Sequence, residues 1–196
     1  MERIPRLTLI NSITGYKPAN LIGTSSNTGI HNLAIFSSVL HLGSAPPLIG
    51  MVSRPTVVER DTYRNILEKR FYTINHVHHD QVAQAHQTSA SYPSEVSEFE
   101  ACGFTPWWSE NFPVPFVAES PLKIGLSFQE EIPIKANGTI LIIGQVEEVH
   151  LPQEAMDEAG NLDFSCLGTA CITGLDTYHK AEPIDRFPYA RVKPKD

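Results

Sequence analysis

Several signatures that would assign this chain to a common class of proteins are missing from its sequence. Only 3 cysteines occur in 196 residues, so they cannot all pair, and Cys166 and Cys171 lack the C-x-x-C spacing of a zinc or redox site. No apolar run approaches the roughly 18 residues that a membrane span needs, and the first residues lack the apolar segment of a signal peptide. These absences predict reduced thiols in a cytoplasmic protein that does not associate with a membrane.

Motifs that bind nucleotides or activate a nucleophile are absent as well. The sequence has no Gly-Lys-[Ser/Thr] of a P-loop, no G-x-G-x-x-G of a dinucleotide fold and no G-x-S-x-G of a hydrolase. The formal net charge of −7 disfavours nucleic-acid binding, which needs basic patches. We therefore expect no nucleic-acid partner and no serine-type nucleophile.

Chain length and proline content indicate one domain made of short elements. A chain of 196 residues is large enough to bury a core, and we expect residues 1–196 to form a single domain. The 15 prolines favour many turns over long helices. Apolar and β-branched runs predict strands over residues 33–42, 48–52, 71–77, 123–129, 139–149 and 169–173. Asn137-Gly138 predicts a hairpin turn between two of them.

Helices are predicted only as short insertions between strands. Asp61, Asp80 and Ser94 are expected to cap three of them. The apolar run at residues 7–10 is expected on a sheet edge, and the proline-rich residues 104–121 are expected to be irregular. This pattern predicts a mainly β protein, a small antiparallel barrel with peripheral helices. The pattern by itself leaves an α+β sandwich as the alternative.

Residues 18–62 carry the strongest chemical signal, because residues 18–58 contain no carboxylate. Hydroxyl and amide side chains fill the turn at residues 24–29, and a later strand ends at Ser53 before Arg54. Neutral donors, backbone N–H groups and one guanidinium, with no competing anion, suit a phosphate monoester. The segment therefore predicts a phosphate-binding surface. A polar loop whose hydroxyls only cap turns would have a similar composition.

The order of residues in this segment resembles the flavin reductase-like family, the FMN-binding split β-barrel proteins. That family has a Thr-x-x-x-x-Gly-x-x-Asn-x-Ala-x-x-Ser stretch, then a strand bounded by Pro-Pro and a helix that starts with Asp-Thr. The chain supplies, in that order, Thr24, Gly29, Asn32, Ala34, Ser37, Pro46, Pro47, Asp61 and Thr62. Further matches are Asn65-Ile66, Thr73-Ile74-Asn75, His86-x-Thr88-Ser89 and Ser97-Glu98-Phe99. The resemblance is good over residues 15–150 and weak beyond them.

The resemblance implies an FMN-binding split barrel of Greek-key antiparallel strands, assembled as a homodimer with FMN near the interface. It implies an oxidoreductase of the flavin reductase type, which takes hydride from NADH or NADPH. Electrons would then pass to a free flavin, a metal chelate or a partner protein such as an oxygenase. The residues that it implies at the cofactor are Thr24, Ser25, Ser26, Asn32, Leu33, Ala34, Ser37, Ser53, Arg54, Thr62, His86 and Ser89. No catalytic residue is named, because hydride transfer between two cofactors depends on orientation.

Some of these residues also suit a purely structural role. Asp61 and Thr62 are ordinary residues for a helix start. His86 suits a hydrogen bond at a helix end as well as a cofactor contact. Tyr178 and His179 are candidates for a nicotinamide pocket through the resemblance alone, and the chain departs there from the usual family ending.

Two aromatic clusters invite other interpretations. In His76-x-His78-His79, we expect surface or capping histidines and no metal, because no properly spaced carboxylate or third ligand completes a site. The adjacent Trp107 and Trp108 indicate packing or an interface anchor rather than a lid over a flavin.

Two other functions stay open. One is a flavoprotein that reduces a different small molecule or carries electrons, and the other is a non-catalytic flavin- or haem-binding module. A yellow protein whose colour is bleached by NADH or NADPH would favour an enzyme over a binding module. The sequence does not distinguish NADH from NADPH, since no residue that reads a 2′-phosphate is identifiable.

Overall fold

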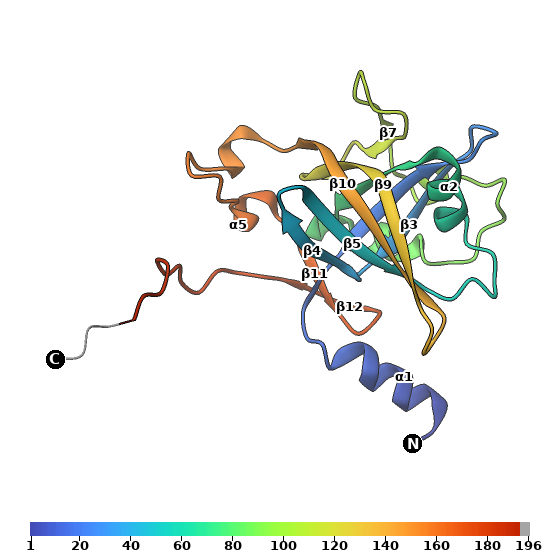
Figure 1. Cartoon of the computed structure of the whole chain (residues 1–196), viewed down its shortest axis with the longest axis horizontal. Helices are drawn as coiled ribbons and strands as arrows, with labels where there is room; N and C mark the ends of the chain where they lie inside the picture. Colours follow the sequence, from blue (N-terminus) through green and yellow to red (C-terminus); the bar gives the residue numbers. More distant parts are fainter. Residues whose placement is uncertain (193–196) are drawn as a thin grey trace.

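A computed structural model describes residues 1–192, which contain a seven-stranded sheet, a three-stranded sheet and a two-stranded ribbon (Figure 1). The large sheet has the order β3-β2-β6-β9-β10-β5-β4, and every neighbouring pair in it is antiparallel. Its strands are β2 (Asn20–Ser25), β3 (His31–Phe36), β4 (Val39–Ser44), β5 (Pro47–Ser53), β6 (Phe71–His76), β9 (Lys123–Ile134) and β10 (Thr139–His150).

The large sheet curls into a barrel because its two edge strands follow each other in the chain. β3 and β4 lie at opposite ends of the strand order, yet only Ser37 and Ser38 separate them. The Val52 N–H donates to the Ser38 carbonyl at 3.1 Å, and the Ser38 hydroxyl donates to the Val52 carbonyl at 2.8 Å. The predicted strand over residues 33–42 is therefore wrong as one strand, whereas the predicted mainly β, antiparallel barrel is confirmed.

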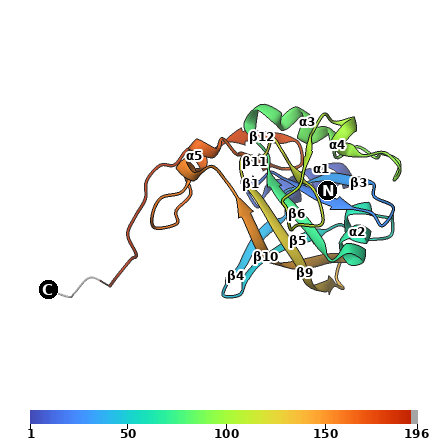
Figure 2. The same cartoon turned by 90° about the horizontal axis from the view of Figure 1, so that it is seen from above.

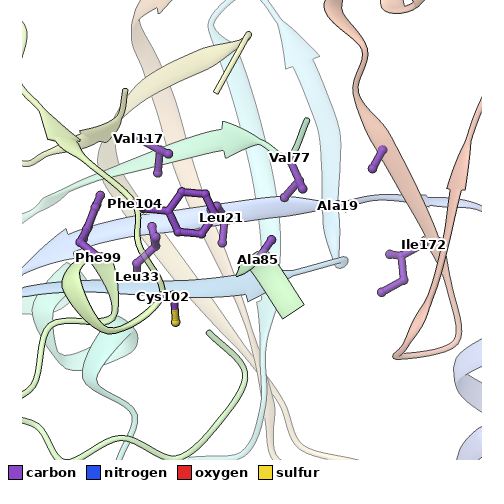
Figure 3. Close-up of a cluster of buried hydrophobic side chains, with 11 residues drawn as sticks. Ala19, Leu21, Leu33, Val77, Ala85, Phe99, Cys102, Phe104, Val117 and Ile172 are labelled. Carbon is purple, nitrogen blue, oxygen red and sulfur yellow. The ribbon is translucent and has the colours of Figure 1, made fainter. Parts of the chain in front are cut away.

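β2 is buried on both faces, which explains its lack of alternation. Ile22 faces the barrel interior with Met51 and Tyr72, and all three are 0% exposed. Leu21 faces the other way, into a second cluster with Leu33 that the helices cover (Figure 3). Side chains of successive strand residues point to opposite faces, so β2 separates two cores.

Three short helices, α2 (Asp61–Lys69), α3 (Val82–Gln87) and α4 (Glu98–Ala101), pack against β3. α2 places Ile66 in the interior cluster of Ile22, whereas α3 and α4 place Ala85 and Phe99 in the cluster of Leu21. The three predicted caps are wrong in detail. Asp61 is the first residue inside α2, Asp80 lies inside the 3-10 turn η1 (His79–Gln81) capped by His78, and α4 begins well after Ser94.

The hairpin and the proline-rich excursion largely agree with the sequence. β9 and β10 form the predicted hairpin, with Gly138 at φ 75°. Its loop is the four residues 135–138, because Ile134 pairs with Thr139, so the two-residue turn expected from Asn137-Gly138 is wrong. The excursion contains a small ribbon of β7 (Pro106–Trp107) and β8 (Phe116–Val117). Between β10 and the last strands lie the 3-10 turn η2 (Gln153–Ala155) and α5 (Phe164–Leu167).

The two ends of the chain lie outside the barrel. Residues 7–10 are not on a sheet edge but inside α1 (Arg3–Ser12), a helix with no buried residue. A three-stranded sheet of β1 (Lys17–Pro18), β11 (Ala170–Thr173) and β12 (Thr177–Lys180) follows in space, and residues 181–192 extend away from it (Figures 1 and 2). No helix within residues 1–192 is both long enough and apolar enough to cross a bilayer.

Candidate functional site

A buried network of neutral side chains joins the β2–β3 hairpin to the start of α2. The Asn32 amide donates to the hydroxyls of Thr24 at 3.2 Å and Thr62 at 3.0 Å. The Asn65 amide also donates to Thr24, at 3.2 Å. All four side chains are buried, at most 8% exposed, so they hold α2 against β3. Three predicted site residues therefore meet here, and the Thr24 hydroxyl is already occupied.

Most hydroxyl groups in the turn after β2 form hydrogen bonds within residues 25–31. Ser26 accepts from the Ile30 N–H at 3.0 Å and pairs with Thr28 at 2.8 Å. Ser25 lies 2.9 Å from His31 Nδ1, and burial lowers the pKa of this histidine. These contacts make the turn rigid, which is the capping role that its composition also allowed.

The outer edge of β3 is held by a carboxylate that the sequence analysis did not select. Glu98 in α4 accepts from the Leu33 N–H at 3.0 Å, and the glutamate is 9% exposed. Burial, with a contribution from the negative charge of Asp61, raises the pKa of the Glu98 carboxyl. The family resemblance included Glu98 in Ser97-Glu98-Phe99, and this was the signal that pointed to it. Ala34 remains half-buried beside this anchored residue.

Ser53 and Arg54 lie next to the bend between β3 and β4. Ser53 ends β5 directly after Val52, whose backbone bonds Ser38. The Ser53 hydroxyl donates to the Arg54 carbonyl at 3.3 Å. Ser37 is half-buried and Arg54 is exposed. Within residues 1–192, the Arg54 guanidinium forms no ion pair. The structure thus places an unpaired cation beside two serines.

Arg60 is a second arginine with free donor capacity, and the sequence analysis missed it. It directly precedes α2, where Thr62 bonds Asn32 of β3. Its Nε–H is buried and has no hydrogen-bond partner in the described residues. An unpartnered buried donor costs free energy unless a ligand satisfies it. The neighbouring Asp61 carboxylate does not accept the Arg60 Nε–H, and it pairs with Arg64 instead.

His86 and Ser89 lie on the far side of β3 from α2. Ala85 of α3 packs on Leu33 in the cluster of Figure 3, which fixes the helix beside β3. His86 Nδ1 lies 3.0 Å from the Tyr178 hydroxyl, and Ser89 donates its N–H to the His86 carbonyl. Burial raises the pKa of Tyr178 to about 12. The His86 side chain therefore bonds a tyrosine of β12 rather than the end of its own helix, and a cofactor contact stays a prediction.

β3 is the element that these groups share, and we call residues 31–38, 53–54 and 60–62 the β3 surface. It combines neutral donors, strand backbone and two arginines, which fits a phosphate monoester next to a flat ring. Two hollows of the chain lie elsewhere. One of about 180 Å³ is bounded by Pro18, His76 and Phe164, and the other lies beside α1.

Comparisons with known proteins identify the family and the fold of the chain. The profile of the flavin reductase like domain matches residues 16–165. An uncharacterized protein from Halalkalibacterium halodurans is 30% identical over 150 residues, which cover 74% of this chain and 72% of the relative.

Two solved structures show the same fold. The first, a candidate flavin reductase with a split barrel domain from Shewanella frigidimarina NCIMB 400, is 44% identical with a TM-score of 0.93, covering 97% of this chain and 94% of that one. Component B of nitrilotriacetate monooxygenase from Bacillus cereus is 23% identical with a TM-score of 0.86, covering 95% of each chain. The predicted split barrel is confirmed, and the chain belongs to the family of flavin reductase-like domains.

Proposed function

We propose that this chain binds FMN on the β3 surface and works as an oxidoreductase that takes hydride from NADH or NADPH. The observation that carries the proposal is a pair of arginines, Arg54 and Arg60, that form no ion pair within residues 1–192 and lie beside a strand that contributes only neutral groups. Family membership supports the same chemistry. The cytoplasmic location expected from the reduced thiols stays a prediction.

The residues of the β3 surface divide the work of holding FMN. Arg54, Ser37 and Arg60 would meet the phosphate, because charge-assisted hydrogen bonds from guanidinium groups are the strongest available there. The backbone of Asn32–Ala34 would face the edge of the ring, where the small Ala34 leaves room. Thr24, Ser25 and Ser26 would position this backbone through the contacts described above.

The chemistry that FMN supplies when bound is acceptance of a hydride and release of its electrons. The chain contributes orientation, exclusion of water and positive charge near the phosphate. Glu98 holds the Leu33 N–H, so the strand that faces the ring cannot shift. His86 and Ser89 would border the same space from α3. Each of these roles binds or positions, and none requires a proton to move.

Names of structural relatives support flavin binding and a redox partner. A Thermus thermophilus protein described as FMN-binding is 18% identical with a TM-score of 0.72. The Bacillus cereus protein is a component of a monooxygenase. We therefore propose that electrons leave this chain for a free flavin, a metal chelate or a partner oxygenase.

We also propose that the chain works as a homodimer with FMN near the interface. α1 buries no residue, although Ile4, Leu7 and Ile10 are apolar. Residues 181–192 expose further apolar side chains, including Phe187 and Tyr189. One small barrel cannot enclose a flat tricyclic ring, so a second copy would cover it. Light scattering should give twice the 21.7 kDa of the chain, and a monomer at micromolar concentration would contradict the dimer.

The direct test is the absorbance spectrum of the purified protein. We expect a yellow protein, or a colourless one that takes up added FMN, whose flavin band is bleached by NADH or NADPH under anaerobic conditions. A colourless protein that does not bind added FMN would refute the proposal. A protein that binds FMN but is not reduced by either nucleotide would be a flavin-binding module rather than this enzyme.

A further inference from the structure

Three consecutive side chains after β6 converge outside the β3 surface. His78, His79 and Asp80 turn their ligand atoms toward one another, all within 4.8 Å. His78 Nδ1 lies 3.6 Å from one Asp80 carboxylate oxygen, and His79 Nε2 lies 3.4 Å from the other. The sequence analysis expected no carboxylate at this position, but the structure places Asp80 beside both rings. The 3-10 turn η1 folds the chain back, so that neighbours in sequence meet in space.

These separations match those of ligands around one small divalent cation. Zinc lies about 2.0–2.1 Å from a histidine nitrogen and about 2.0–2.2 Å from a carboxylate oxygen. In tetrahedral geometry, two such ligand atoms are then about 3.4 Å apart. Two nitrogen–oxygen separations, 3.4 Å and 3.6 Å, are close to that value, although they involve different Asp80 oxygens. The ligand atoms of all three residues lie within 4.8 Å of one another, so binding a cation would draw the side chains closer together.

One of the two imidazole rings is already oriented for this role. His79 Nδ1 lies 2.7 Å from the Gly168 carbonyl, and only a protonated Nδ1 can donate to that oxygen. The lone pair of His79 therefore lies on Nε2, which faces Asp80. A second ring nitrogen bonded to a carbonyl is the usual arrangement of metal-binding histidines. His78 Nδ1 accepts from the Asp80 N–H at 3.3 Å, so this nitrogen is unprotonated, and a bound cation would replace this long hydrogen bond.

Gly168 makes this orientation possible. It has φ 59°, and a Cβ there would lie 2.5 Å from His78 Nε2 and 3.0 Å from His79 Nδ1. A glycine thus lets the loop after α5 press against both rings. The side chains are 30%, 30% and 76% exposed for His78, His79 and Asp80, so a cation from solvent can reach them.

We propose that His78, His79 and Asp80 bind one divalent transition-metal ion of the zinc class, with the remaining coordination position open to solvent. Imidazole with carboxylate is a donor set that suits zinc and its neighbours better than calcium or magnesium. The site shares no residue with the β3 surface, so it does not depend on FMN binding.

The test treats the full chain with a chelator, removes the chelator, and then titrates the protein with Zn²⁺ in an isothermal titration calorimeter. We expect one Zn²⁺ per chain. Loading the chelator-treated protein with Co²⁺ instead of Zn²⁺ should give the visible absorption of a low-symmetry, four-coordinate cobalt site. His79→Asn keeps a side-chain N–H for the Gly168 carbonyl but removes the Nε2 ligand. Its zinc affinity should fall at least tenfold, since even partners behind the ligands contribute about 10–100-fold.

Two matched controls separate the cluster from ordinary surface binding. His41→Ala removes an exposed histidine of β4, and Cys166→Ser removes an exposed thiol, so both should bind Zn²⁺ like the parent chain. Asp80→Asn should weaken binding while circular dichroism stays unchanged. Zinc binding that survives in His79→Asn, or that is lost in Cys166→Ser, would overturn the proposal. So would a parent chain that binds no Zn²⁺ at all, which would leave His78 as a cap of η1.

Discussion

Two regions of the molecule differ in how their side chains are buried. One is the corner formed by β2, β3 and α2, and the other is the pair of chain ends. In the corner, polar groups bond one another and apolar groups pack on both faces of β2. At the ends, α1 and residues 181–192 leave apolar side chains in water, with Ile4 76% and Phe187 79% exposed. The corner is thus packed within one chain, with the Arg60 Nε–H as an unpartnered donor in the described residues, whereas the ends expose apolar surface that we propose a second copy covers.

The same substitution in the two regions gives the largest expected contrast. Leu21→Ala removes a fully buried side chain and should lower the free energy of unfolding by about 2–5 kcal/mol. Leu7→Ala in α1 should change it by less than about 0.5 kcal/mol in the monomer. Urea unfolding at low protein concentration measures both. Equal losses would show that α1 packs on the barrel of its own chain.

The dimer proposal sharpens this comparison. If α1 lies at an interface, Leu7→Ala should weaken self-association although it leaves the monomer's stability unchanged. Sedimentation over a range of concentrations measures this directly. A Leu7→Ala protein that associates like the parent chain would remove α1 from the interface.

Arg54 tests whether the corner is complete without a ligand. Arg54→Ala should lower FMN affinity by about 1.5–3 kcal/mol, the contribution of a hydrogen bond to a charged group. This corresponds to roughly 10- to 150-fold in Kd. Arg3→Ala, in exposed α1, is the control for the loss of one positive charge. Fluorescence quenching of free FMN gives both constants, and equal affinities would take Arg54 out of the phosphate site.

Much of the barrel could be predicted because its signals are local. The Asn137-Gly138 turn and the alternation in β9 depend only on neighbouring residues. Ser37-Ser38 could not be recognised as a bend, because the chain turns there from β3 into β4, and Ser38 then pairs with Val52 of β5, a partner distant in the sequence. α1 was missed for a related reason, since a helix that buries no residue has no core-facing pattern to read.

The candidate site was easiest to predict where residues close in sequence act together. Thr24 and Asn32 lie across one hairpin, and the sequence identified both. Glu98 reaches Leu33 across 65 positions, and Arg60 becomes notable only because its Nε–H is buried without a partner. The tertiary fold brings these groups to β3, and no pattern of neighbouring residues predicts that they lie there.

Glu98 gives a test with a defined pH dependence. Its pKa is raised in the folded chain, so folding favours the protonated form, and this contribution is fully present below the unfolded pKa. It is lost as the pH rises through the folded pKa. The stability of Glu98→Gln relative to the parent should therefore increase from pH 4 to pH 7. Glu98→Ala, which leaves the Leu33 N–H unpaired, should cost about 1–3 kcal/mol. A pH-independent difference between parent and Gln variant would show that burial does not control this carboxyl.

The smallest effect is expected on the chemical step itself. His86 bonds Tyr178, and His179 bonds Thr173 at 2.9 Å and lies edge-on to Tyr16, so both rings have structural partners. If donor and acceptor of the hydride are both cofactors, His86→Ala and His179→Ala should alter nicotinamide KM or FMN affinity more than the reduction rate. Rapid mixing of FMN-loaded protein with saturating NADH or NADPH isolates that rate. A residue that transfers a proton in this step would instead contribute about 10²–10⁴-fold. A thousandfold slower reduction in either variant, with FMN still bound, would make that histidine catalytic. It would also show that the ring of a structural pair can act on the reacting atoms.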